Sequence, residues 1–470
     1  MRSVWIKRLC GLLNYSKQIR FSLLLVVLIL LSIFPGGILL ADGEEGVRPA
    51  PASLTANVIK KVFPNGLTLL IKPTHDHELV SVNLYARMGT LYEAPDQIGI
   101  SALMQRCLLY GGTTSREPHI IYRGLEKLGA HWNASSGADI GNVWMTVTTP
   151  GLYHALDFYF DLILHPQFAE WDVEIGKKES IERLKGIDDH PSNTVFILFS
   201  QGFYGEHPYG KLTIGNEETI ASLTREDLVA WHEKIYIPNN MVFTVVGNVD
   251  PVEVTAEFEK AFGRMKKGRL PRRTRKKSPA LKEDKLLYQP REVEGAYLIL
   301  GYPAPNCLQK DAPVMEVLNN ILGASGMGNR LYSELRDKRG LAYAIGSSYQ
   351  QMVGPSLVNA FMITAPENFQ VAREGIVAEF KRFCEEPVST IELENTKKWL
   401  KGTYVMAQET TAAQGRLLGV YELLGYGYDY PDQYFSLIDA VTPEDIQRVA
   451  KKYFHHYVLA VLAPEGTIEE

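Results

Sequence analysis

One six-residue pattern occurs twice in the chain, and this repeat constrains the fold more than any other feature. Leu223-Thr-Arg-Glu-Asp-Leu228 in the first half is matched by Val441-Thr-Pro-Glu-Asp-Ile446 in the second, with corresponding residues 218 positions apart. A Thr followed three residues later by an acidic residue is typical of a capped helix start. An apolar run that predicts a strand follows each helix, at 242–247 and 458–463. The repeat therefore predicts two copies of one α+β unit.

The remaining periodicity fills in the first of these units. Alternating apolar residues predict a strand at 80–87 and a hairpin formed by 132–136 and 142–149. Longer apolar stretches predict helices at 98–109 and 152–164. We therefore expect an α+β fold of two homologous domains, each a mainly antiparallel sheet with helices packed on one face.

The expected domain boundaries follow from changes in composition. After a lead-in at 42–57, we place the first domain at 58–265, a basic linker at 266–285 and the second domain at 286–470. The run Arg272-Arg-Thr-Arg-Lys-Lys277 in this linker has two interpretations, a nucleic-acid patch or a solvated connection. The formal net charge of the whole chain is −5. This acidic balance favours the connection and predicts no nucleic-acid partner.

The N-terminal segment, residues 1–41, has the composition of a targeting signal. Its five positive charges come with no acidic residue, and an apolar run at 21–34 follows them. This run is shorter than the roughly 20 residues that span a bilayer, which favours a cleaved signal peptide. The alternative is an uncleaved anchor formed by 21–40. We expect an exported protein, either soluble in the periplasm or anchored to the inner membrane.

The segment Gly99-Ile-Ser-Ala-Leu-Met-Gln-Arg-Cys-Leu-Leu-Tyr-Gly-Gly-Thr113 resembles the zinc-binding helix of the pitrilysin/insulinase peptidase family, which includes the mitochondrial processing peptidases. In that family the helix carries H-x-x-E-H, with two histidine ligands on one face and a glutamate as general base. The resemblance places Ala102, Gln105 and Arg106 at these three positions. By spacing, it places Arg183 at the family's third ligand, a glutamate on a later helix.

None of these four residues suits the role that the family assigns to its position. Ala102 has no donor atom, Gln105 is not a base, and Arg106 and Arg183 are cations that repel a divalent metal. The resemblance therefore predicts a degenerate metal site and no zinc or other cofactor in this chain.

Two further segments match parts of the family that surround the substrate. Asn133-Ala-Ser-Ser-Gly-Ala-Asp139 resembles a strand that borders the bound peptide, which makes Asn133, Ala134 and Ser135 candidate substrate-binding residues. The loop Gly323 to Gly328, which includes Gly326, resembles a short form of the glycine-rich loop of non-catalytic partner subunits. A plain turn between helices is the alternative for this loop.

An arginine and a tyrosine seven residues apart are also typical of the family, and here they are Arg336 and Tyr343. The resemblance implies that both reach the zinc site of the opposite half, where they hold the substrate backbone and stabilise the oxyanion. A guanidinium and a phenol are suitable donors for developing negative charge. The alternative is structural: Arg336 caps a helix end and Tyr343 packs on a strand.

The resemblance runs from about 58 to 465 and implies the LuxS/processing-peptidase-like metallohydrolase fold. It predicts a non-catalytic subunit that forms a heterodimer with an H-x-x-E-H partner, which would hold the zinc and cleave an extended peptide. Whether the chain forms a homo- or a hetero-oligomer stays open. The alternative function is a peptidase-like binding or assembly protein with no proteolytic partner.

Overall fold

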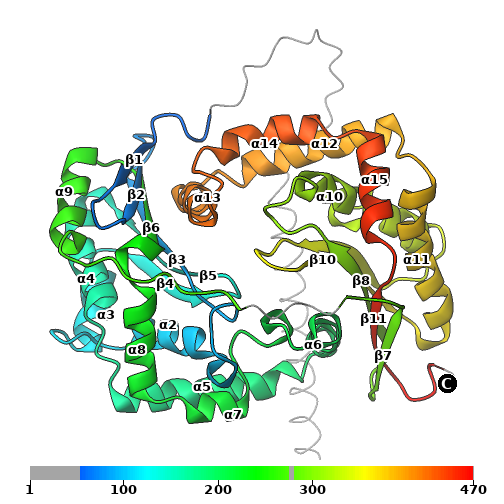
Figure 1. Cartoon of the computed structure of the whole chain (residues 1–470), viewed down its shortest axis with the longest axis horizontal. Coiled ribbons are helices and arrows are strands. Elements are labelled where there is room, and N and C mark those ends of the chain that lie inside the picture. The colour runs from blue at the N-terminus through cyan, green and yellow to red at the C-terminus, as the bar shows by residue number, and fades with distance from the viewer. Residues whose placement is uncertain (1–52, 275–279, 469–470) are drawn as a thin grey trace, which may run out of the picture. The chain divides into compact units, whose positions relative to one another are not determined.

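The computed structural model describes residues 53–274 and 280–468, which contain two mixed β-sheets with their own helices (Figure 1). The predicted targeting segment at 1–41 and part of the basic run lie outside the described residues. No helix within the described ranges has both the length and the apolar character that crossing a membrane requires.

The first half contains these strands and helices: β1 (Ile59–Val62), β2 (Thr68–Pro73), β3 (Leu79–Arg87), α2 (Ile100–Tyr110), α3 (Pro118–Lys127), β4 (His131–Ser136), β5 (Ile140–Thr148), α4 (Leu152–Leu164), α5 (Glu170–Ile187), α6 (Pro191–Tyr204), α7 (Glu217–Ser222), α8 (Arg225–Ile235), β6 (Met241–Gly247) and α9 (Pro251–Phe262). Short 3-10 turns lie at η1 (Pro95–Gln97), η2 (Thr149–Gly151), η3 (Pro208–Gly210) and η4 (Pro238–Asn240).

The second half contains β7 (Lys285–Pro290), β8 (Ala296–Ala304), α10 (Ala312–Asn319), β9 (Ala344–Gln350), β10 (Ser356–Thr364), α11 (Phe369–Glu385), α12 (Thr390–Met406), α13 (Thr411–Leu424), α14 (Tyr430–Asp439), α15 (Pro443–Tyr453) and β11 (Val458–Ala463). Two π-helical turns, η5 (Asn320–Ala324) and η6 (Tyr332–Asp337), and a 3-10 turn, η7 (Pro366–Asn368), complete it.

The two sheets confirm the repeat that the sequence predicts. The first has the strand order β1-β2-β6-β3-β5-β4 and the second β7-β11-β8-β10-β9. In both, the strand after the repeated helix pairs in parallel on one side and antiparallel on the other, as β6 does with β2 and β3 and β11 does with β7 and β8. The α8 and α15 helices begin at capping boxes formed by Thr224 with Asp227 and Thr442 with Asp445.

Each half lends one helix to the sheet of the other half. Along β3, Val82 and Leu84 face the large core of the first half, whereas Tyr85 faces Leu418 of α13. This alternation follows from the two-residue period of a strand. In the second sheet, α6 packs on β11 and β8, and Figure 1 shows α13 beside the first sheet and α6 beside the second. The expectation that helices cover one face is therefore incomplete, because α13 and α6 cover the second faces.

Glycines allow α13 to approach the first sheet closely. A Cβ atom added at Gly419 would lie 2.4 Å from the Tyr85 ring, and one added at Gly415 would lie 2.5 Å from the Asn83 amide nitrogen. These separations are shorter than any that real Cβ atoms adopt. The α13 backbone therefore contacts β3 directly.

Candidate functional site

The α2 helix, which resembles a zinc-binding helix, is held firmly at its start. The two carboxylate oxygens of the buried Glu93 accept hydrogen bonds from the backbone N–H groups of Gly99, at 2.9 Å, and Ser101, at 3.1 Å. A carboxylate satisfies the free N–H groups of a helix N-terminus and complements its dipole. Residues 102, 105 and 106 therefore have well-defined positions within the first half.

Gln105 is buried and uses its side-chain amide as a structural link. Its Nε2 donates to the backbone oxygens of Ser135, at 3.1 Å, and Asn142, at 3.3 Å, and its Oε1 accepts from the Tyr236 hydroxyl at 3.0 Å. Burial raises the pKa of Tyr236, so that this hydroxyl remains a donor. Because two of the partners are carbonyl oxygens, a carboxylate at position 105 would be repelled by them. The site is therefore built around an amide and not around a general base.

Arg106 joins α2 to α5 through two carboxylates. Its Nη1 lies 2.5 Å from Oδ1 of Asp172 and its Nε lies 2.9 Å from Oε2 of Glu179. Its guanidinium carbon also lies over the Tyr110 ring, 5.2 Å from the centroid. Burial alone would lower the pKa of Arg106, but hydrogen bonds to Glu179 and Asp172 outweigh it and raise the pKa above its usual value. The guanidinium therefore supplies a permanent positive charge between α2 and α5.

The α5 residue that contacts Arg106 is not the one that the sequence spacing predicts as the third ligand. Spacing along the sequence predicts Arg183, yet the α5 residue that reaches Arg106 is Glu179, one helical turn earlier. The Arg183 side chain is exposed. Arg183 therefore stays a prediction for the third ligand position, and the structure adds Glu179 as a second candidate.

The residues around Arg106 do not fit a zinc ion. Ala102 has no donor atom, and the two nearby carboxylates, Asp172 and Glu179, are already paired with a guanidinium. Zinc prefers three or four His, Cys or carboxylate ligands. Across 53–274 and 280–468, no group of three or more His, Cys, Asp or Glu residues is arranged to hold a metal ion.

The β4 strand lies next to this site at the edge of the first sheet, and among the strands that the structure describes it pairs with β5 alone. Its candidate residues alternate as a strand requires, with Asn133 and Ser135 exposed and Ala134 buried. The Ser135 hydroxyl donates to Oδ1 of Asn142 at 2.6 Å. The free edge of β4 leaves backbone groups available for an added strand.

Arg336 and Tyr343 lie in the second half, on η6 and directly before β9. The Tyr343 side chain is 67% exposed, and its backbone N–H donates to the Ile363 oxygen at 2.9 Å. The exposed Arg336 guanidinium lies over the Tyr332 ring, 5.1 Å from the centroid. The structural alternative for Tyr343 is that its side chain packs on a strand. Because the phenol is exposed, this alternative does not describe it well.

The glycine-rich loop is held by one amide. Nδ2 of Asn329 donates to the backbone oxygens of Gly323, Ser325 and Gly326, at 3.4, 2.5 and 2.6 Å. A Cβ atom at Gly323 would lie 2.8 Å from atoms of Leu331 and Ser347, whereas one at Gly328 would meet nothing within 4 Å. Only Gly323 is therefore required by packing, and Gly326 and Gly328 leave the loop surface free of side chains.

Two family models match the chain, one after the other. The model described as "Insulinase (Peptidase family M16)" matches residues 68–217, and the model described as "Peptidase M16 inactive domain" matches residues 222–400. The chain belongs to the M16 peptidase family. Together the two matches include the candidate site on α2 and α5 as well as Arg336 and Tyr343.

Known relatives of this M16 chain cover nearly its whole length. It is 27% identical over 406 residues to the uncharacterized zinc protease YmxG of Bacillus subtilis, covering 86% of this chain and 98% of the relative. It is 26% identical to an uncharacterized zinc protease of Rickettsia felis, covering 83% of this chain and 93% of the relative.

Solved structures share the M16 fold. A peptidase M16 inactive domain from Pseudomonas fluorescens superposes with a TM-score of 0.81 at 20% identity and covers 88% of this chain and 100% of its own. A protease from Helicobacter pylori superposes with a TM-score of 0.80 at 22% identity and covers 87% of this chain and 99% of its own. These likenesses confirm the predicted α+β fold.

Sequence reasoning missed the two carboxylates that define this M16 site. Asp172 and Glu179 are seven residues apart on α5 and therefore lie on one face of the helix. The sequence did contain a signal for these carboxylates, because an arginine at a buried ligand position requires a carboxylate partner nearby.

Proposed function

We propose that this chain is a non-catalytic subunit of a heterodimeric M16 peptidase. The observation that carries the proposal is the ion pairing of Arg106 with Asp172 and Glu179, where an active member of the family would hold zinc. A permanent cation paired with the available carboxylates replaces the charge of a metal without its Lewis acidity. In this proposal the fold around the site is retained, and another chain carries out the hydrolysis.

Two surfaces support a role beyond maintaining the fold. The β4 edge offers unpaired backbone groups beside Ser135, where an extended peptide can add as a strand. Arg336 and Tyr343 present an exposed guanidinium and phenol, neither of which the fold of the second half requires. In the proposed complex they donate hydrogen bonds to the peptide backbone and to the oxyanion.

The partner in this proposal is an M16 chain that keeps H-x-x-E-H. Its zinc would polarise the scissile carbonyl and activate a water molecule. This chain would contribute the walls of the closed chamber and two preorganised donors. Donors that are fixed in a water-excluded site stabilise developing charge more than water does.

Reconstitution tests the proposal directly. The chain and an H-x-x-E-H chain from the same genome are purified separately and mixed with an extended fluorogenic peptide. We expect zinc-dependent hydrolysis from the mixture and none from this chain alone. The alternative, a binding or assembly protein without a peptidase partner, predicts that no complex forms with the H-x-x-E-H chain. Full turnover by the H-x-x-E-H chain alone would contradict our proposal.

A further inference from the structure

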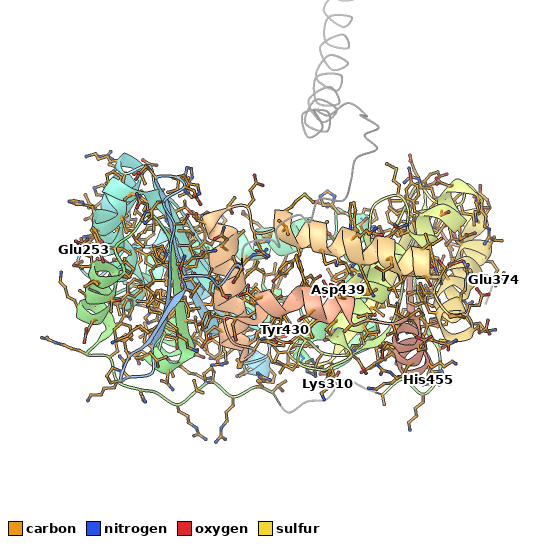
Figure 2. All side chains as sticks on the ribbon, turned by 90° about the horizontal axis from the view of Figure 1, so that it is seen from above. Glu253, Lys310, Glu374, Tyr430, Asp439 and His455 are labelled. Atoms are coloured by element: carbon orange, nitrogen blue, oxygen red, sulfur yellow. The ribbon has the colours of Figure 1, made fainter. Side chains whose placement is uncertain are left out.

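A second site lies where helices of the C-terminal half meet the turn between β4 and β5. Figure 2 shows Tyr430 between the two sheet-containing halves, with Glu253 and Glu374 at their outer sides. The pocket beside Tyr430 has a volume of about 250 Å³ and is lined by α10, α13, α14 and the segments around Asp139 and Gln351. The proposed peptidase role uses none of these residues.

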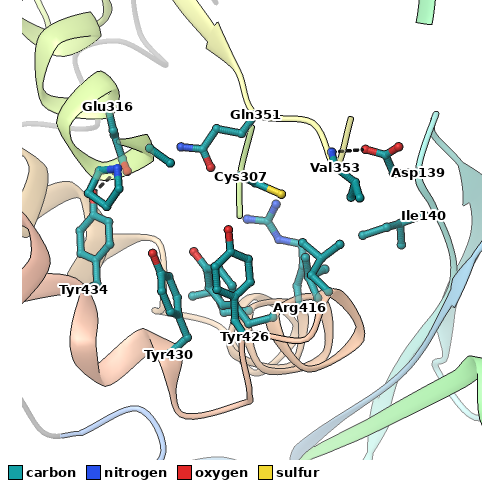
Figure 3. A pocket seen from close by; sticks show the side chains of 16 residues that line it. Asp139, Ile140, Cys307, Glu316, Gln351, Val353, Arg416, Tyr426, Tyr430 and Tyr434 are labelled. Atoms are coloured by element: carbon teal, nitrogen blue, oxygen red, sulfur yellow. Dashed lines mark hydrogen bonds between the residues drawn. The ribbon is translucent and has the colours of Figure 1, made fainter. Parts of the chain in front are cut away.

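Tyrosines form the floor of this pocket. Tyr421, Tyr426 and Tyr430 contact one another, with ring centroids 4.5 to 5.7 Å apart. In Figure 3 the hydroxyls of Tyr426 and Tyr430 point toward Gln351 and Cys307 and away from the helix backbones. Burial raises the pKa of all three phenols, so their hydroxyls stay protonated. The floor therefore presents several hydrogen-bond donors.

Glu316 lines one wall of the pocket, and its carboxyl group has no cationic partner in the part of the chain that the structure describes. Glu316 on α10 accepts a hydrogen bond from the Tyr434 hydroxyl at 2.7 Å, drawn as a dashed line in Figure 3. Burial raises the pKa of Glu316 above its usual value. Among the residues that the structure describes, no Lys, Arg or His side chain forms an ion pair with it. A carboxylate removed from water in this way is stabilised by a cationic partner.

The opposite charge lies across the tyrosines. Arg416 on α13 extends its guanidinium toward Cys307, on the other side of the Tyr426 and Tyr430 hydroxyls from Glu316 in the view of Figure 3. Within 53–274 and 280–468 it forms no ion pair. Leu417 and Val420, from the same helix, supply an apolar surface along the pocket. The lining therefore offers a negative group, a positive group and an apolar strip with hydroxyl donors.

We propose that this pocket binds a small zwitterion whose ammonium group pairs with Glu316 and whose carboxylate pairs with Arg416. Such a ligand neutralises both unpaired charges at once without adding net charge to the pocket. Its methylene chain would lie against Leu417 and Val420. Both a free amino compound of this kind and the C-terminal lysine of a peptide carry an ammonium group and a carboxylate joined by a methylene chain.

Calorimetric titration of the full chain with three matched probes tests the proposal. 6-Aminohexanoate carries both charges, hexylamine carries only the ammonium group and hexanoate carries only the carboxylate. We expect 6-aminohexanoate to bind at least about tenfold more tightly than either analogue. Absence of binding up to about 10 mM, or equal binding of hexylamine or hexanoate, would overturn the proposal.

Variants locate the site and guard against binding elsewhere. Glu316→Gln and Arg416→Gln should each weaken binding of 6-aminohexanoate at least about tenfold. The matched controls are Glu379→Gln, which alters another carboxyl whose pKa burial raises, and Arg123→Gln, which alters an exposed arginine on α3. Unchanged affinity in the two pocket variants would overturn the proposal even if the wild-type chain binds the probe.

Two further probes distinguish the source of the zwitterion. A tripeptide that ends in lysine is compared with its C-terminal amide in the same titration. Binding of the acid but not of the amide would assign the pocket to peptide ends, whereas binding of 6-aminohexanoate alone would assign it to a free amino compound. Because these titrations need no peptidase partner, their outcome is independent of the proposed heterodimer.

Discussion

The Nε atom of Arg106 lies 2.9 Å from a carboxylate oxygen of Glu179, across the gap between α2 and α5. The same guanidinium reaches the buried Asp172, whose side chain is only 3% exposed. A cation thus occupies the position that the sequence resemblance assigns to a zinc ligand. Loss of the Arg106 guanidinium would leave the buried Asp172 carboxylate with no compensating charge.

Replacing Arg106 should therefore destabilise the fold. We expect Arg106→Met to lower the free energy of unfolding at pH 7 by about 3 kcal/mol, because Asp172 remains buried and unpaired. Burial already raises the pKa of Asp172 although Arg106 opposes this, so in the variant the folded pKa of Asp172 would lie further above its unfolded value. The variant should then be most stable at low pH and lose stability as pH rises through that folded pKa.

Urea unfolding at pH 4 and pH 7 measures both effects. Arg123→Met, at an exposed position on α3, serves as the control and should change the stability little. If Arg106→Met unfolds at the same urea concentration as the wild type at pH 7, then the ion pairs contribute nothing to the fold.

Two substitutions should restore a metal site. In the double variant Ala102→His and Arg106→His, which keeps Gln105 and its hydrogen bonds, two histidines would face the carboxylate of Glu179, which is already present. We expect about one zinc per chain by metal analysis after dialysis. Adding Glu179→Ala should abolish zinc binding, whereas adding Arg183→Ala should leave it intact. The reverse result would return the third ligand position to Arg183.

Much of the fold was predictable because its signals are local. The two Thr–Asp capping boxes and the alternation of β3 and β5 depend on residues close in sequence, and the structure confirms them. The partners of Arg106 were not predictable in this way, because contact between α2 and α5 depends on how the intervening segments pack. The exchange of α6 and α13 was also missed, because an apolar helix face does not specify which sheet it covers.

Tyr343→Phe separates a catalytic role from a structural one. With the proposed partner present, loss of the hydroxyl should lower kcat by about 100-fold if the phenol stabilises the oxyanion. Because the side chain is 67% exposed, the melting temperature and the affinity of the two chains should not change. An unaltered kcat in the assembled complex would limit this subunit to shaping the chamber, and Tyr332→Phe provides a neighbouring control.

Two glycine substitutions test how closely α13 packs on the first sheet. Gly419→Ala should destabilise the chain by about 1–3 kcal/mol, since the new Cβ atom would meet the Tyr85 ring. Gly402→Ala, on α12, has nothing within 4 Å and should stabilise it by up to about 1 kcal/mol. Thermal unfolding of both variants gives the comparison, and shifts of the same sign would contradict the packing.

His232 should make the chain sensitive to mild acid. Burial lowers its pKa to about 4, and its Nε2 lies 2.8 Å from the Ile163 oxygen, which requires a protonated nitrogen there in the neutral ring. Its unfolded pKa is about 6.5, so the unfolded state binds more protons between these values. Stability should thus be complete above pH 6.5 and fall by about 3 kcal/mol as the pH drops toward 4. In His232→Gln, unfolding curves across this range should show a shallower dependence on pH.

The exchange of helices between the two halves has a consequence for how such a chain can be divided. A fragment that ends before β7 would lack α13 and expose Tyr85 and Val246 on its sheet, while the complementary fragment would lack α6 and expose Ile299 and Ala460. Each fragment alone would expose an apolar sheet face, and association of the two fragments would bury both faces again. The two repeats are therefore inseparable in practice, and an ancestor that encoded only one of them would have needed a second copy of itself to cover its sheet.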